Sequence, residues 1–252
     1  MEIRYYKWYS YNLNRDMEYK VYGEQGIPFF YFPTQYQRFY EAENRGIIHE
    51  LAKYIEEGKL FVIAVDSIDS ESLSNTTYWD KRKRLELQEA YHNYFTNELY
   101  EVIKKEYNPY SLPVLFGMSF GAYQAMNFFI RRPMLYKGVF ALSGIYNIRF
   151  FINDYYDDLS YLNSPIDQIR LMNNDYYLDI YRHKKIVMVV SSGAYEESSI
   201  NDTYDLQQSF LHREILNVEA YYWTSDYPHD WSSWKTYLNF YIHDFLYWFI
   251  SF

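Results

Sequence analysis

Hydrophobic positions along the chain follow two spacings, one typical of strands and one of helices. Short apolar runs bounded by polar or turn-forming residues predict strands, whereas apolar residues three and four positions apart predict amphipathic helices. The predicted strands are residues 7–10, 17–22, 27–32, 60–65, 112–116, 138–142, 185–191 and 218–223. The predicted helices are residues 43–57, 83–107, 122–132, 203–216 and 231–249.

The order of these elements indicates an α/β fold. After an initial hairpin, strands and helices alternate, which predicts a mostly parallel central sheet with helices on both faces. The alternation is interrupted by residues 144–181, an irregular segment rich in Asn, Asp and Tyr that we expect to form a cap-like insertion. No linker divides residues 1–252, so we expect a single domain.

The sequence Gly117-Met118-Ser119-Phe120-Gly121 lies between a predicted strand and a predicted helix. This G-x-S-x-G pattern in that context is typical of the nucleophile elbow of the α/β-hydrolase fold. Glycines two residues on either side remove side chains that would clash in so tight a turn. The Ser119 hydroxyl is therefore expected at the carboxyl edge of the sheet, above a helix N-terminus that favours negative charge.

A serine hydroxyl needs a general base, and one of the six histidines is suitably placed. Four histidines fall within predicted helices, and His183 precedes a strand at the amino edge of the sheet. His229 follows the last predicted strand, so its loop emerges at the same edge as Ser119. We therefore predict that His229 is the base.

The carboxylate that orients the histidine should follow the strand at residues 185–191, because hydrolases of this fold have the chain order serine, acid, histidine. Glu196 is the preferred candidate, Glu197 is the second and Asp202 is the next. The alternative is that Glu196 and Glu197 are both solvated loop charges.

An oxyanion formed on the substrate needs two donors. The first predicted donor is the backbone N–H of Phe120, the residue after the nucleophile. The second should come from the loop after residues 27–32, where Thr34 is the first choice and Gln35 the second.

Composition excludes several classes of function. The net charge of −9 argues against binding to nucleic acid or to an anionic membrane. The absence of cysteine excludes disulfides, thiolate catalysis and zinc–thiolate sites. No apolar signal-peptide core follows Met1, and residues 237–252 are too short and too polar to span a bilayer, so we expect a cytoplasmic protein. A homodimer is compatible with the sequence.

The chain resembles the esterase D-like family of α/β-hydrolases over nearly its whole length. The residues that carry the resemblance are 7–10, 15–18, 32–35, 65–69, 117–122, 143–144, 194–197 and 229–231. The resemblance implies a metal-independent serine carboxylesterase that needs no cofactor and acts on a small-molecule ester. It assigns the nucleophile to Ser119, the base to His229 and the acid to Glu196. Residues 33–37 lack the glycine-rich pattern usual in esterase oxyanion loops.

The predicted reaction is ester hydrolysis through an acyl-enzyme with a Ser-His-Glu triad. One alternative is an acyltransferase or thioesterase that uses the same site. Another is a catalytically silent binding module with the hydrolase fold.

Overall fold

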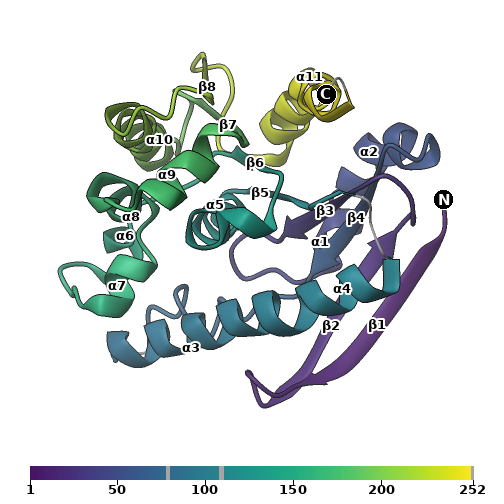
Figure 1. The fold of residues 1–252 in the computed structure, drawn as a ribbon, viewed down its shortest axis with the longest axis horizontal. Coiled ribbons are helices and arrows are strands. Elements are labelled where there is room, and N and C mark those ends of the chain that lie inside the picture. Colours follow the sequence, from purple (N-terminus) through teal and green to yellow (C-terminus); the bar gives the residue numbers. More distant parts are fainter. Residues whose placement is uncertain (78–79, 108–110, 251–252) are drawn as a thin grey trace.

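The computed structural model describes residues 1–77, 80–107 and 111–250. Within these residues, eight strands form one sheet in the order β1-β2-β4-β3-β5-β6-β7-β8 (Figure 1). The strands are β1 (Ile3–Ser10), β2 (Arg15–Tyr22), β3 (Ile27–Phe32), β4 (Leu60–Val65), β5 (Val114–Met118), β6 (Gly138–Leu142), β7 (Lys185–Ser191) and β8 (Val218–Trp223). The pairs β1–β2 and β2–β4 are antiparallel, and all other neighbouring strands are parallel.

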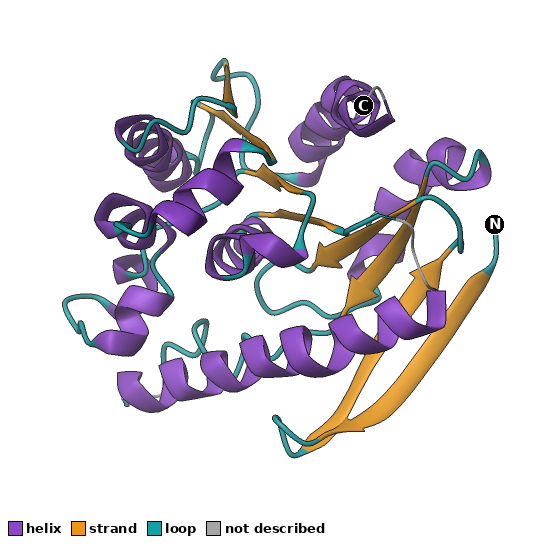
Figure 2. Cartoon of the chain, in the orientation of Figure 1, coloured by secondary structure: helices purple, strands orange, loops and turns teal. Residues whose placement is uncertain are grey.

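Helices cover both faces of the sheet (Figure 2). They are α1 (Glu41–Asn44), α2 (Ile47–Glu56), α3 (Lys81–Tyr94), the π-helical turn η1 (Phe95–Leu99), α4 (Tyr100–Tyr107), α5 (Phe120–Arg131), the 3₁₀ turn η2 (Pro133–Leu135), α6 (Arg149–Ile152), α7 (Asp158–Leu162), α8 (Pro165–Leu171), α9 (Asp175–Arg182), α10 (Glu197–His212) and α11 (Trp231–Ile250). This arrangement confirms the predicted α/β-hydrolase fold.

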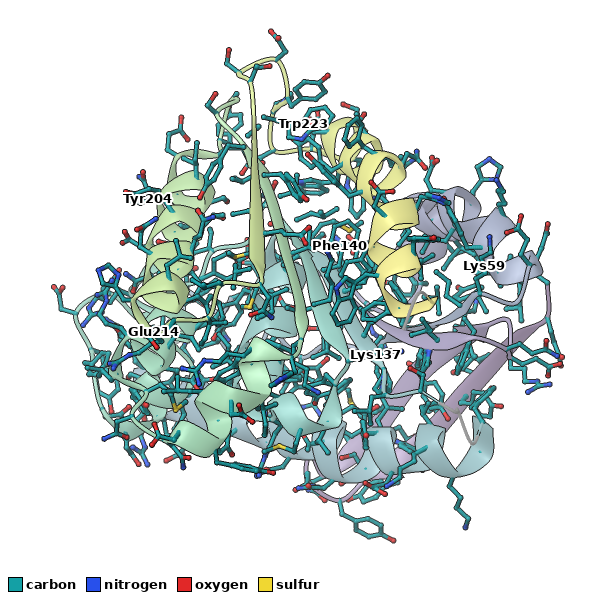
Figure 3. The ribbon with its side chains drawn as sticks, turned by 45° about the horizontal axis from the view of Figure 1, so that its top comes forward. Lys59, Lys137, Phe140, Tyr204, Glu214 and Trp223 are labelled. Atoms are coloured by element: carbon teal, nitrogen blue, oxygen red, sulfur yellow. The ribbon has the colours of Figure 1, made fainter. Side chains whose placement is uncertain are left out.

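The strands β3 to β7 bury both of their faces because apolar side chains occupy both sets of alternating positions. On β3, Phe30 and Phe32 belong to the apolar cluster that includes α3, α4 and α5. Phe29 belongs to the opposite cluster, which includes α2 and α11. In that second cluster Phe140 of β6 lies beneath α11 and stacks on Phe245, with ring centroids 5.0 Å apart (Figure 3).

Several predicted boundaries are wrong, each for a local reason. The helix predicted at 43–57 is two helices, because Gly46 between α1 and α2 has a φ of 78°. The helix predicted at 83–107 begins at Lys81 and contains the π-helical turn η1. The helix predicted at 203–216 begins six residues earlier, with Glu197 as its first residue.

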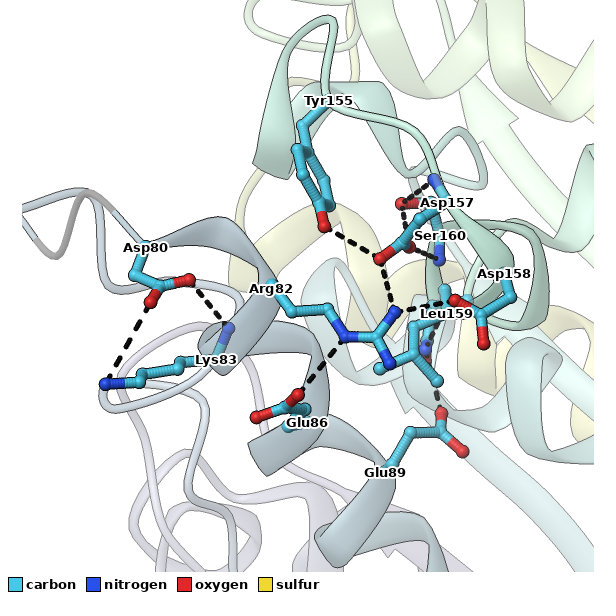
Figure 4. A network of polar contacts seen from close by, with 11 residues as sticks. Asp80, Arg82, Lys83, Glu86, Glu89, Tyr155, Asp157, Asp158, Leu159 and Ser160 are labelled. Carbon is cyan, nitrogen blue, oxygen red and sulfur yellow. Dashed lines mark hydrogen bonds and ion pairs between the residues drawn. The ribbon is translucent and has the colours of Figure 1, made fainter.

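The segment predicted as irregular, residues 144–181, contains most of the four short helices α6 to α9. These helices have between four and eight residues each. Short helices offer too few turns for an apolar period to stand out, which explains the wrong prediction. Arg82 at the start of α3 contacts Asp157 and Asp158 and so joins α7 to the rest of the chain (Figure 4).

Candidate active site

Ser119 occupies a strained turn between β5 and α5. Its φ is 53° and its ψ is −122°, a backbone conformation that side-chain-bearing residues rarely adopt. A Cβ atom on Gly117 would lie 2.4 Å from the carbonyl carbon of Gly121, and one on Gly121 would lie 2.2 Å from the Phe32 carbonyl oxygen. Only glycine therefore fits at both positions, and the turn presents Ser119 at the carboxyl edge of the sheet.

His229 lies next to this serine. Its Nε2 atom is 2.8 Å from Ser119 Oγ, although 110 positions separate the two residues in the chain. The imidazole packs edge-on against the Trp234 ring, with centroids 4.9 Å apart and the planes at 87°. The His229 side chain is 18% exposed, so the ring is held by packing while the serine side stays reachable.

Glu196 lies behind the histidine and is fully buried. Its Oε2 atom is 3.2 Å from His229 Nδ1, which is within ion-pair distance, but the two atoms are not aligned as a hydrogen bond. The other carboxylate oxygen accepts a hydrogen bond from the Ser143 hydroxyl.

The other two acid candidates are placed differently. Glu197 is exposed at the start of α10. Asp202 accepts hydrogen bonds from the backbone N–H groups of Tyr146 and Asn147, at 2.7 and 2.8 Å, and burial raises its pKa to about 6. Among the three candidates, Glu196 is the one paired with His229 in the described structure.

The loops that carry Glu196 and His229 are fastened to each other. The His229 N–H donates to the Ala194 carbonyl at 2.9 Å, and the Ser191 hydroxyl donates to the Tyr227 carbonyl. A Cβ atom on Gly193 would lie 2.1 Å from the Tyr227 oxygen, so only glycine allows this approach. These contacts therefore fix the positions of the Glu196 loop and the His229 loop relative to each other.

The two candidates for the second oxyanion donor differ in their hydrogen bonds. The Thr34 N–H donates to Glu41 Oε2 at 2.7 Å, and the Thr34 hydroxyl also donates to Glu41. The backbone N–H groups of Gln35 and Phe120 have no partner among the described residues. The Thr34 amide is therefore already engaged, whereas the Gln35 amide is available to a ligand.

Ser119 opens into a small pocket of about 170 Å³. Its lining residues are Gln35, Ser119, Phe120, Ile145, Phe150, Phe151, Tyr195, Ser198 and His229. Part of the apolar lining comes from Ile145, between β6 and α6, and from Phe150 and Phe151 of α6. No lysine or arginine lines the pocket, which suits an uncharged ligand.

The described part of the chain contains no group of three or more His, Asp or Glu side chains arranged to hold a metal ion. None of its helices is long and apolar enough to cross a membrane.

Comparison with known proteins agrees with this geometry. Residues 10–244 match the model of the esterase family described as "Putative esterase". The chain belongs to this esterase family. Members of the family are hydrolases, so the chain is a hydrolase, and the family implies a small-molecule ester substrate. No curated protein matches the chain in sequence.

Three solved structures illustrate the similarity in fold. A ferulic acid esterase is 15% identical, with a TM-score of 0.70 over 94% of this chain and 95% of its own. An S-formylglutathione hydrolase from Agrobacterium tumefaciens is 12% identical, with a TM-score of 0.72 over 97% and 94%. A fluorophosphonate-binding serine hydrolase from Staphylococcus aureus is 13% identical, with a TM-score of 0.70 over 97% and 98%.

Sequence reasoning assigned no role to three buried polar residues around the site. Ser143 follows β6 directly, has a φ of 52° and donates to Glu196. A polar residue after a strand at the carboxyl edge was a usable signal for it. Glu41 and Asp69, which bind the loop after β3, gave no such signal, because their partners depend on the folded path of that loop.

Proposed function

We propose that this hydrolase is a serine carboxylesterase in which Ser119, His229 and Glu196 act as nucleophile, base and acid. The observation that supports the proposal most strongly is the 2.8 Å contact between Ser119 Oγ and His229 Nε2, with buried Glu196 3.2 Å behind the imidazole. A serine on a strained elbow, a reachable imidazole and a buried carboxylate together meet the requirements of acyl transfer.

Acylation would begin when Ser119 Oγ attacks the ester carbonyl while its proton passes to His229 Nε2. The backbone N–H groups of Phe120 and Gln35 would hold the oxyanion of the tetrahedral intermediate. The intermediate then collapses, the ester C–O bond breaks, and the leaving alkoxide takes the proton from His229.

Deacylation repeats these steps with water. His229 takes a proton from the attacking water, and Ser119 leaves as the hydroxyl when it regains that proton. Throughout, Glu196 would accept a hydrogen bond from Nδ1–H, which fixes the tautomer and stabilises the imidazolium. Ser143, which donates to the far oxygen of Glu196, would keep that carboxylate oriented.

The pocket supports a small, uncharged substrate group. A volume of about 170 Å³ with walls from Ile145, Phe150 and Phe151 suits a short acyl chain or a single ring. These residues belong to the segment at 144–181, which we propose as a partial cap over the nucleophile. Tyr195, which is 85% exposed, stands at the mouth of the pocket.

The test is covalent labelling of the purified protein with a fluorophosphonate, followed by intact mass. We expect one adduct on the wild type, none on Ser119→Ala, and slow labelling of His229→Ala. A folded wild-type protein that takes no adduct would contradict the proposal and favour a silent binding module. Added alcohols that become acylated in place of water would instead identify a transferase.

The acid assignment needs a matched pair of variants. Glu196→Gln should lower kcat by about 10³-fold or more, because the imidazole loses the charge that fixes its tautomer. The control is the exposed neighbour variant Glu197→Gln, which should keep nearly full activity. The opposite pattern would transfer the role of the acid to Glu197.

A further inference from the structure

The loop after β3 lies against the first turn of α5. A Cβ atom on Gly121 would be 2.2 Å from the Phe32 oxygen and 2.9 Å from the Pro33 oxygen, so the two backbones are in direct contact. Two residues further along, Gln35 lines the same pocket as Ser119. The loop therefore brings Gln35 into the pocket that contains Ser119.

Two buried carboxylates from outside this loop bind the residues on either side of Gln35. Glu41, at 2% exposure, accepts from the Thr34 N–H at 2.7 Å, from the Thr34 hydroxyl and from the Tyr31 hydroxyl at 2.9 Å. Asp69, also at 2% exposure, accepts from the Tyr36 N–H at 2.7 Å. Each carboxylate thus fixes the residue on one side of Gln35.

The backbone at Tyr36 needs such a constraint. Its φ is 63°, in the left-handed region that a tyrosine adopts at a cost in conformational energy. The Asp69 contact holds the Tyr36 amide, and the Tyr36 hydroxyl donates to the Ser74 carbonyl at 2.8 Å. With Thr34 and Tyr36 both held, the orientation of the peptide between them is determined.

We propose that Glu41 and Asp69 are positioning residues that direct the Gln35 N–H toward the oxyanion formed at Ser119. The inference rests on the proposed esterase function. It explains why the loop needs no glycine-rich sequence: hydrogen bonds to two side chains replace the usual backbone pattern. The carboxylates accept hydrogen bonds from the Thr34 and Tyr36 amides on either side, and the Gln35 amide between them is left without a partner.

The role of the carboxylates is to fix geometry, since a negative charge nearby would oppose the oxyanion rather than stabilise it. Burial raises the pKa of both groups, so each is kept in place at an energetic cost. A neutral amide of the same shape should therefore serve as well. In Glu41→Gln the amide oxygen can accept from Thr34 N–H and Tyr31, while the new NH₂ group can donate to the Thr34 hydroxyl.

The experiment compares Glu41→Ala and Glu41→Gln for hydrolysis of 4-nitrophenyl acetate and for the rate of fluorophosphonate labelling. Glu41→Ala should lower kcat by about 10- to 100-fold with KM within about threefold, as expected for a misplaced oxyanion donor. Glu41→Gln should recover most of that loss, and Asp69→Ala and Asp69→Asn should behave in the same way. Glu43→Ala is the matched control, because Glu43 lies on the same helix but at the surface, bound to Lys20.

A double variant links the effect to the donor itself. Gln35→Pro removes the N–H, and it should lower kcat by about 100-fold, much more than Gln35→Ala, which keeps the amide. Adding Glu41→Ala to Gln35→Pro should cause little further loss, because both changes remove the same interaction. If the two losses multiply, Glu41 does not act through the Gln35 N–H and the inference is wrong.

The outcomes separate this inference from the proposed function. A wild type that is not labelled contradicts the esterase assignment. A labelled wild type together with a fully active Glu41→Ala contradicts the positioning role of Glu41 and leaves the esterase assignment standing. If circular dichroism shows that Glu41→Ala does not fold, Thr34→Val can be used instead, because it removes only the hydroxyl contact with Glu41. A smaller loss of kcat with KM retained would support the positioning role. Full activity in both Thr34→Val and Asp69→Ala would overturn it.

Discussion

The sheet layers and the segment between β6 and β7 differ in how their buried polar groups are paired. The sheet layers bury two large apolar clusters, and they leave some polar atoms inside them without a partner. Examples are the Tyr19 hydroxyl and both ring nitrogens of His92. Ser164 and Tyr146 show that the inserted segment also has such atoms, but they are the minority there.

In the inserted segment, paired polar side chains add to apolar contacts, since Ile166, Ile169 and Tyr181 belong to the same apolar cluster as one sheet layer. Fully buried Asn163 donates to Glu89 at 2.9 Å and accepts from Asn127 at 3.1 Å, and its backbone carbonyl accepts from the Tyr123 hydroxyl at 2.8 Å. Gln168 donates to Asn127 at 3.0 Å. Paired polar contacts specify one position for the segment, whereas the apolar layers gain stability without requiring every polar atom to be paired.

This difference matches the two tasks at the site. Ser119 and His229, the proposed nucleophile and base, lie at the sheet edge, where the backbone packs closely at Gly121 and Gly193. The apolar pocket wall lies on the inserted segment, where Phe151 packs against Phe120 with ring centroids 5.5 Å apart. We therefore expect substitutions in the inserted segment to change substrate preference, and substitutions at the carboxyl edge of the sheet to change the reactivity of Ser119.

The largest expected effect concerns the unpaired His92 in the sheet layers. Burial lowers its pKa to about 2, so the folded state stays neutral while the unfolded state binds a proton below its ordinary value of 6.5. Wild-type stability should therefore fall as the pH decreases below 6.5, by about 1.4 kcal/mol per pH unit from this group. His92→Leu should raise the free energy of unfolding by about 2 kcal/mol at pH 5, and by much less at pH 8.

Urea unfolding at the two pH values measures this effect. The control is His49→Leu, because His49 is exposed on α2 and its replacement removes no buried nitrogen. An equal gain at pH 5 and pH 8 would show that the effect is packing against Phe128 rather than protonation.

Some features of these two regions could be predicted from the sequence and others could not. The elbow and the His229 loop could be predicted because they depend on chain order and on apolar periods long enough to recognise. The sequence favoured Glu196 over Glu197 but could not show that Glu196 is the buried one, because the folded loop decides which of two adjacent carboxylates is buried. The preference for Thr34 over Gln35 did not take account of the bond from the Thr34 amide to Glu41, because that partner lies seven positions away.

A second prediction tests whether the inserted segment sets substrate preference. Phe150 lines the pocket and is 54% exposed, so its truncation should cost little stability. Phe150→Ala should raise KM for an aromatic ester about fivefold through lost apolar contact, with the fluorophosphonate labelling rate nearly unchanged. Phe240→Ala, at 64% exposure on α11 and outside the pocket lining, is the control. A fall in kcat with KM unchanged would mean that the segment also positions the reacting groups.

The smallest expected effect concerns the ionic attachment of α7. Arg82 lies 2.7 Å from Asp157 and 2.6 Å from Asp158, and Tyr155 also donates to Asp157 at 2.8 Å (Figure 4). Burial opposes ionisation of Asp157, but hydrogen bonds from Arg82, Ser160 and Tyr155 lower its pKa to about 2, so the pair is charged at neutral pH.

Arg82→Ala should lower the free energy of unfolding by less than about 1 kcal/mol, because the guanidinium is half exposed and screened by water. Added salt should shrink the difference between the variant and the wild type. Hydrogen exchange should become faster at residues 157–162 while the amides of β5 and β6 keep their protection. Lys83→Ala is the control, since Lys83 is 4.0 Å from Asp80 and contributes little. Equal loss of protection in β5 would show that the segment and the sheet unfold as one unit, and the distinction between paired polar attachment and apolar layers would then have no energetic meaning.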